Sequence, residues 1–139
     1  MKVQSFGVIP LIRIEAQWNV FLILHRAGNH WGFPKGRKEE SETHLEAAKR
    51  ELREETGLSI LRLLKPEPLE ESYIFHKKHQ TVSKTVFYFL AEVTGSVNLQ
   101  EKEVSEGKWV ALNEAAKHID FPEAKSLCQE VIRCLENLK

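Results

Sequence analysis

The hydrophobic residues near the start of the chain form two short runs. Residues 6–14 and 20–24 are rich in Val, Ile and Leu, and the polar segment 15–17 separates them, so they predict a pair of strands joined by a turn. Further along, the β-branched and aromatic residues of 81–93 predict a long strand, and 109–112 predicts a short one. Strand patterns therefore lie on both sides of the middle of the chain.

The middle of the chain has a helical pattern. Neither Pro nor Gly interrupts residues 42–56, which predicts a helix. Thr43 and Glu46 have the spacing of a capping box at its start, and Gly57 supplies a stop at its end. The Pro-Glu-Pro segment 66–68 marks a connection to the next strand.

The end of the chain predicts two more helices. Asn113 is a candidate N-cap of the first, and Pro122 suits the first position of the second. The apolar stripe of the second helix consists of Leu127, Val131, Leu135 and Leu138. Strands early, a helix between them and helices late imply an α/β fold, in which a central mixed sheet is flanked by helices on its faces.

Length and charge limit the class of protein. A chain of 139 residues is long enough for one domain and too short for two ordinary ones, so we expect a single domain over 1–139. Its 20 Lys and Arg balance its 20 Asp and Glu, so no overall field draws it to long nucleic acid or to a membrane. An anionic ligand must therefore be held by local groups.

The chain carries no pattern for export or for membrane insertion. No apolar stretch follows a basic start, and nowhere does an apolar run approach the ~18 residues that a spanning helix needs. Cys128 and Cys134 stand six apart in a helical pattern, which points them toward one face and predicts reduced thiols. We therefore expect a cytoplasmic protein.

Three carboxylates share one face of the middle helix. Glu51, Glu54 and Glu55 stand at i, i+3 and i+4, beside an apolar stripe that includes Leu52. Like charges this close repel, and a hard divalent cation with oxygen ligands would resolve the conflict, Mg²⁺ first and Mn²⁺ second. The alternative is a solvated acidic face on an exposed helix.

The spacing around these glutamates decides between the two. Segment 36–58 has Gly36, five residues, Glu42, seven residues and then the run Arg-Glu-Leu-Arg-Glu-Glu-Thr-Gly-Leu. It matches every fixed position of the Nudix box, G-x5-E-x7-R-E-U-x-E-E-x-G-U with U aliphatic, and a chance match is on the order of 10⁻⁸. The chain thus resembles the Nudix hydrolase family, whose fold is an α/β/α sandwich.

This resemblance implies the chemistry of the box. Glu51, Glu54 and Glu55 look like metal ligands that hold Mg²⁺ against a pyrophosphate, with one of them acting as a general base. The carbonyl of Lys35 resembles a further ligand. Arg50 lies one turn from Glu54, where an ion pair could fix the ligating rotamer; its alternative is an ordinary surface pair.

Residues outside the box resemble the asymmetrical diadenosine tetraphosphatase subfamily. The resemblance rests on Trp-Gly-Phe-Pro-Lys-Gly at 31–36, on 84–93 and on the spacing of 103–109. It implies hydrolysis of diadenosine tetraphosphate to ATP and AMP; separately, we expect a monomer. The residues that the resemblance assigns are His30, Lys35 and Lys84 on phosphates, Glu103 at the metal, and Tyr73 and Phe121 around an adenine ring.

Each of these assignments has a simpler rival. Tyr73 and Phe121 could be packing residues, His30 could cap a turn, and Lys84 could protect a strand edge. The basic run 76–79 is expected in a loop, as a solvated tip or as an extra phosphate grip. At the level of function, the alternatives are a pyrophosphohydrolase of RNA 5' ends or another nucleoside-diphosphate derivative, and a non-catalytic module that senses a nucleotide.

Overall fold

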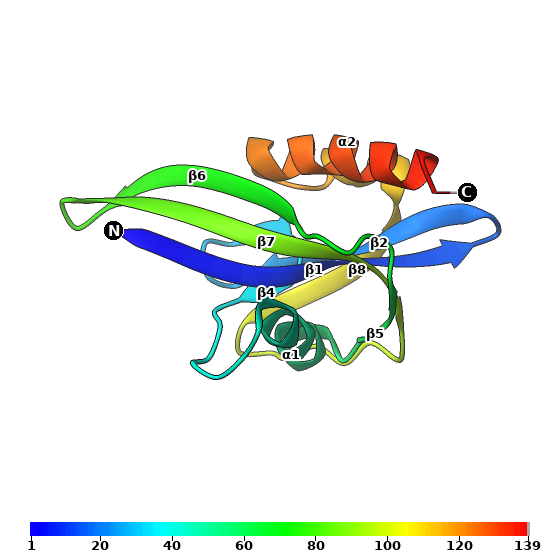
Figure 1. Ribbon diagram of the computed structural model, residues 1–139, viewed down its shortest axis with the longest axis horizontal. Coiled ribbons are helices and arrows are strands. Elements are labelled where there is room, and N and C mark those ends of the chain that lie inside the picture. The colour runs from blue at the N-terminus through cyan, green and yellow to red at the C-terminus, as the bar shows by residue number, and fades with distance from the viewer. Residues whose placement is uncertain (139) are drawn as a thin grey trace.

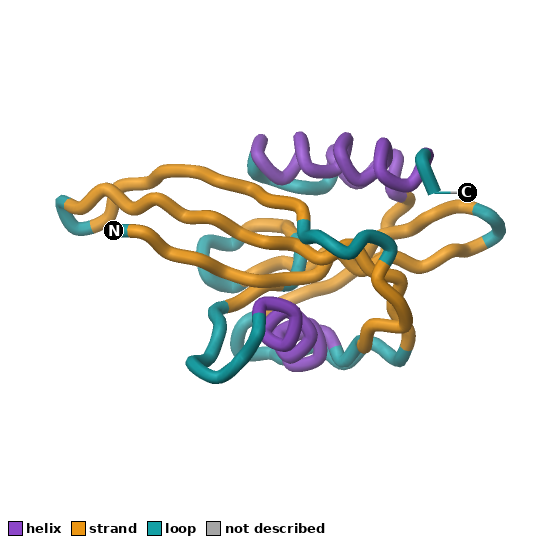
Figure 2. Tube along the Cα trace, in the orientation of Figure 1, coloured by secondary structure: helices purple, strands orange, loops and turns teal. Residues whose placement is uncertain are grey.

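The protein is a mixed β-sheet with a helix on each face, which confirms the predicted α/β architecture (Figures 1 and 2). The computed structural model describes residues 1–138. The strands are β1 Lys2–Ile14, β2 Gln17–His25, β3 His30–Gly32, β4 Lys35–Gly36, β5 Ser59–Leu63, β6 Leu69–Lys77, β7 Gln80–Thr94 and β8 Val104–Ala111. The helices are α1 His44–Thr56, the 3-10 helix η1 Leu112–Lys117 and α2 Pro122–Glu136.

Strand β1 lies at the centre of the sheet. It runs parallel to β7, with Phe6 opposite Phe87, and antiparallel to β2. Strand β8 pairs along the edge of β2 that faces away from β1, β3 pairs with the last part of β2, and β6 and β5 pair with the first and last parts of β7. The β6–β7 hairpin reaches past the body of the molecule at the left of Figure 1.

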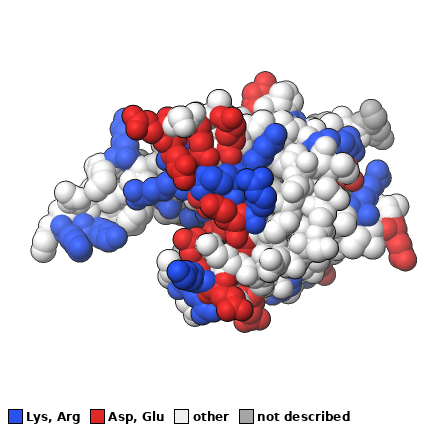
Figure 3. Space-filling model, turned by 90° about the horizontal axis from the view of Figure 1, so that it is seen from below, with Lys and Arg blue, Asp and Glu red and all other residues white. Residues whose placement is uncertain are grey.

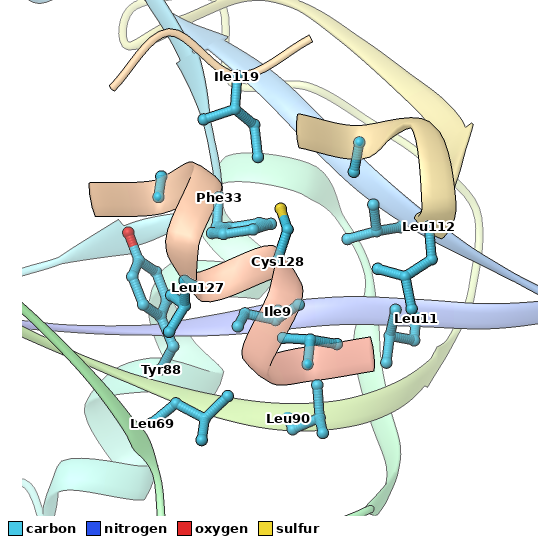
Figure 4. Packing of buried hydrophobic residues seen from close by; sticks show 14 of the residues in the cluster. Ile9, Leu11, Phe33, Leu69, Tyr88, Leu90, Leu112, Ile119, Leu127 and Cys128 are labelled. Carbon is cyan, nitrogen blue, oxygen red and sulfur yellow. The ribbon is translucent and has the colours of Figure 1, made fainter. Parts of the chain in front are cut away.

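The side chains of β1 alternate between two cores, one on each face of the sheet. Phe6 and Val8 pack with Leu52 on the α1 side, while Ile9 and Leu11 pack on the α2 side. Figure 4 shows the α2-side core, in which Leu127 and Cys128 of the helix meet side chains of the sheet. Burial on both faces explains why β1 and β2 read as continuous apolar runs.

The predicted helices hold with two corrections. The capping box of Thr43 and Glu46 and the left-handed Gly57 bound α1, and Pro122 opens α2 as predicted. Asn113 is not an N-cap: it lies inside η1, which begins one residue earlier and has no side-chain cap. Leu138 lies beyond the end of α2 and is 46% exposed, so it does not belong to the buried stripe.

The strand predictions were too short, and some strands were not predicted. The polar start of β1 becomes a strand because residues from Lys2 onward pair in parallel with β7. Strand β8 begins at Val104 because it pairs along β2. Strands β3, β4, β5 and β6 carry no alternation strong enough to predict. Run 76–79 is not in a long loop: it closes the β6–β7 hairpin, with a tight turn at Lys78 and His79.

Both cysteines carry free thiols, as predicted, and Cys128 is buried. Burial raises the pKa of its thiol to about 11. Across residues 1–138, no helix has the length and apolar character needed to span a bilayer.

Candidate functional site

Arg50 ties α1 to the loop that precedes it. Its guanidinium donates two hydrogen bonds, of 2.6 and 3.0 Å, to the carboxylate of Glu42, and one of 2.9 Å to the carbonyl of Arg37. It also donates at 3.0 Å to Glu51 and at 2.8 Å to Glu54, so the predicted i,i+4 pair is present. The hydrogen bonds from Arg50 lower the pKa of Glu42 to about 2, which keeps this pair charged at neutral pH.

A cluster of carboxylates, the Glu51/Glu55/Glu103 cluster, forms beside Arg50. One oxygen from each of the three side chains lies within 4.8 Å of the others. Glu51 and Glu55 come from α1, and Glu103 comes from the turn before β8, about 50 residues away in the sequence. Glu54 stands outside this group: its side chain is 45% exposed and paired with Arg50.

The electrostatics of the cluster favour a bound cation. Burial, and then the charge of Glu51, raise the pKa of Glu55 to about 8. Burial also raises the pKa of Glu51, in spite of its hydrogen bond from Arg50. Ionised carboxylates this close repel one another, and their oxygens form a donor set suited to a hard divalent ion. The residues present therefore fit Mg²⁺ or Mn²⁺.

Gly36 leaves room for the cluster. A Cβ on this residue would lie 2.1 Å from the carboxyl carbon of Glu51, so no other side chain fits without displacing that group. One residue earlier, the backbone N–H of Lys35 donates a hydrogen bond of 2.9 Å to Glu55. The contact seen between Lys35 and the cluster is made by this N–H, and metal ligation by its carbonyl stays a prediction.

A cleft of about 670 Å³ opens between the β6–β7 hairpin and the start of α2. All five residues predicted to bind substrate line it: His30, Lys35, Tyr73, Lys84 and Phe121. They come from β3, β4, β6, β7 and the residue that precedes α2, so the sheet topology brings together positions that are far apart in the sequence.

Two of the cations in the cleft wall, Lys35 and Lys84, lie close together. Burial, and then the neighbouring Lys35 cation, lower the pKa of Lys84 to about 8. An anion between the two ammonium groups would relieve both the desolvation and the repulsion. This wall therefore suits phosphate, although the whole chain has no surplus of positive charge.

Aromatic side chains also line the cleft. The ring of His30 lies 4.6 Å from that of Phe121 and stacks at 4.7 Å on His25, whose Nε2 is 3.0 Å from the Phe33 carbonyl oxygen. Burial lowers the pKa of His25 to about 3, which keeps it neutral. Phe121 is 47% exposed, more than a packing residue would be, and Tyr73 is half-buried. These rings offer flat apolar surfaces to a ligand.

Charged side chains of both signs crowd the face of the molecule that carries α1 (Figure 3). The network around Arg50 belongs to this face. Because positive and negative side chains alternate on this face, they offset the repulsion between the carboxylates, and the face has no large net electrostatic field.

Several residues of the site were not predicted individually. Glu42 matches the box, but its role as the bidentate partner of Arg50 appears only in the structure. Glu71 and Glu123 line the cleft without any signal in the sequence pattern.

The chain is similar to known proteins over most of its length. A family model described as the NUDIX domain matches residues 1–130. The asymmetrical bis(5'-nucleosyl)-tetraphosphatase of Rattus norvegicus is 37% identical over 116 residues, which cover 79% of this chain and 76% of the relative. The Caenorhabditis elegans protein of the same description is 31% identical over 133 residues, 94% of both chains. A crystal structure of a C. elegans Ap4A hydrolase binary complex superposes with a TM-score of 0.75 at 24% identity, covering 96% of this chain and 98% of the other.

Proposed function

Because the chain belongs to the NUDIX domain family, we propose that it is a metal-dependent hydrolase of dinucleoside polyphosphates. The preferred substrate in this proposal is diadenosine tetraphosphate, and the products are ATP and AMP. The proposal rests mainly on Lys35, which contacts both parts of the site. Its backbone N–H binds Glu55 of the Glu51/Glu55/Glu103 cluster, and the same residue lines the cleft. A site for a divalent cation thereby adjoins a site for phosphates and aromatic bases.

Glu51, Glu55 and Glu103 are the proposed ligands of Mg²⁺, with Mn²⁺ as a substitute. Glu54 stays in the proposed set because of its place in the box, and Arg50 holds its carboxylate at 2.8 Å. When bound, the ion would neutralise polyphosphate charge and lower the pKa of a water molecule. The carbonyl of Lys35 remains a further proposed ligand.

The reaction forms one bond between a water oxygen and phosphorus and breaks one P–O–P anhydride bond. Lys35 and Lys84 would hold the phosphate oxygens and offset their charge. Tyr73 and Phe121 would stack on an adenine ring, and His30 would complete the phosphate contacts at the mouth of the cleft. A carboxylate of the box would accept the proton of the water. The work of this chain's residues is thus orientation and electrostatic stabilisation.

Two other functions are less well supported. A pyrophosphohydrolase of RNA 5' ends would gain from a basic surface, and the chain has a formal net charge of zero. A non-catalytic sensor of nucleotides would not need the complete set of box glutamates that is present here. We also propose that the protein acts as a cytoplasmic monomer, which is compatible with its free thiols.

A chromatographic screen with Mg²⁺ tests the proposal. Its substrates are diadenosine polyphosphates, triphosphorylated RNA and modified deoxynucleoside triphosphates. ATP and AMP in equal amounts from the tetraphosphate would support it. Turnover of RNA ends alone would replace it with the second candidate, and binding without turnover of any substrate would favour a sensor.

A further inference from the structure

Three buried polar atoms of the cleft lack hydrogen-bond partners. Over residues 1–138, the buried side-chain atoms without a partner are Nδ1 of His30, Oε2 of Glu71 and Oε2 of Glu123. All three side chains line the cleft. A buried polar group without a partner costs free energy, and such groups are rare in folded proteins. Their gathering in one cleft indicates that a ligand supplies the missing hydrogen bonds.

The two carboxylates lie beside two of the aromatic residues that line the cleft, Tyr73 and Phe121. Glu71 precedes Tyr73 by two positions on β6, so both side chains point to the same side of the strand. Glu123 lies in the first turn of α2, two positions after Phe121. Glu71 is only 9% exposed, and Glu123 is half-buried. A base that stacks on either ring would therefore turn an edge toward a carboxylate.

The chemistry of a carboxylate limits what it can recognise. An ionised carboxylate accepts hydrogen bonds and repels phosphate, so these two groups do not bind the polyphosphate chain. They need a ligand group that donates N–H or O–H. The exocyclic amino groups of adenine and guanine meet this need at the base edge, as does the N1–H of guanine, and the hydroxyl groups of ribose are further donors of a purine nucleotide.

We propose that Glu71, with Glu123 beside it, accepts hydrogen bonds from the amino group of the purine base held in the cleft. The residue then determines specificity: it favours adenine or guanine over a purine without an amino group. A base that lacks the donor would leave a buried carboxylate unpaired, which penalises its binding. This inference rests on the proposed function, because it takes the occupant of the cleft to be a nucleotide.

Calorimetric binding of nucleoside monophosphates in the presence of Mg²⁺ tests the inference without requiring turnover. AMP and GMP are compared with purine riboside monophosphate, which has no amino group. The wild-type protein should bind AMP, GMP or both at least about tenfold more tightly than the amino-free nucleotide. Preference for AMP would identify the adenine amino group as the donor, and preference for GMP the amino group and the adjacent N1–H of guanine. Equal binding of all three would overturn the proposal.

Variants separate base recognition from a general structural role. Glu71→Leu should abolish the discrimination, so that AMP, GMP and purine riboside monophosphate bind within about twofold of one another. Glu71→Gln, which keeps one acceptor and the shape, should show an intermediate loss if Glu71→Leu disturbs the fold. Glu70→Gln, an exposed neighbour on the other side of β6, should bind as wild type does.

Two results would contradict the assignment of Glu71. An equal loss for all three nucleotides in the Glu71→Gln protein would mean that Glu71 only orients Lys35 and Lys84. A loss that instead appears with 2'-deoxy AMP in the wild-type protein would assign the carboxylate to the ribose. Absence of dinucleotide hydrolysis would contradict the proposed function but leave these binding results interpretable.

Discussion

The backbone N–H of Lys35 donates a hydrogen bond of 2.9 Å to the buried carboxylate of Glu55. The side chain of the same lysine lines the cleft. One residue therefore links the acidic cluster to the place where phosphates are proposed to bind. A shift of the short strand β4 would move both parts of the site together.

Substitution of Glu55 by Gln should separate stability from activity. The amide keeps the volume and an acceptor for the N–H of Lys35, and at pH 9, above the pKa of Glu55 of about 8, it removes one negative charge from a group of three. We expect the metal-free variant to melt at a higher temperature than wild type, while turnover falls by about 10² or more. Melting curves and initial rates of tetraphosphate hydrolysis measure the two effects. Wild-type turnover in this variant would refute the site assignment.

The stability of the metal-free protein should depend on pH through Glu55. Its pKa is about 8 in the folded protein against an ordinary value of 4.5, so between these two pH values the folded state holds a proton that the unfolded chain releases. This contribution is fully present below pH 4.5 and is lost as the pH rises through 8. The gap in melting temperature between Glu55→Gln and wild type should therefore widen from pH 5 to pH 9. Saturating Mg²⁺ should narrow the gap, and a gap independent of pH would contradict the buried carboxylate.

Gly36→Ala should displace the carboxylate of Glu51, because the new methyl group would overlap it. We expect at least about tenfold weaker binding of Mn²⁺, measured by electron paramagnetic resonance. Gly32→Ala is the matched control: its Cβ would meet the nearest atom, on His25, at an ordinary 3.8 Å. Equal Mn²⁺ binding by both variants would show that the gap at Gly36 has no part in the site.

Arg50→Lys should lower both stability and turnover. Lysine keeps the charge but cannot form the paired hydrogen bonds to Glu42 while also reaching Glu54. We expect a loss of about 2 kcal/mol in the free energy of unfolding and a lower kcat. Arg53→Lys, exposed on the same helix, should leave both quantities unchanged. Identical urea denaturation curves for the two variants would show that the ion pairs of Arg50 contribute no more to stability than ordinary surface pairs do.

Tyr73→Ala should raise KM more than it lowers kcat if the ring only holds a base. The expected rise in KM is about fivefold to a hundredfold, as for loss of one stacking contact. Ile74→Ala removes an exposed side chain from the other side of β6 and should not change KM. An unchanged KM in Tyr73→Ala would assign the tyrosine to packing.

The sequence predicts the parts of this protein that depend on local pattern. The capping box at Thr43, the stop at Gly57 and the Nudix box all depend on fixed spacing along one segment, and all are found where expected. No glycine or proline marks the end of α2, so the predicted apolar stripe was extended to Leu138, although the helix ends at Glu136.

The parts that escaped prediction depend on contacts between distant segments. Lys2 is in a strand because β7 lies beside it, and nothing in its own segment requires that. Resemblance to a family identified Glu103, but its approach to Glu51 and Glu55 is a property of the fold. Glu71 escaped prediction because its strand, β6, was not predicted, and its place in the cleft depends on the pairing of β6 with β7.

A crystal structure with Mg²⁺ and a non-hydrolysable analogue of diadenosine tetraphosphate is the most direct test of the central claim. The account predicts density for an ion among oxygens of Glu51, Glu55 and Glu103, in contact with a phosphate of the analogue. It is contradicted if the analogue is bound and the three carboxylates hold no ion and point away from its phosphate oxygens.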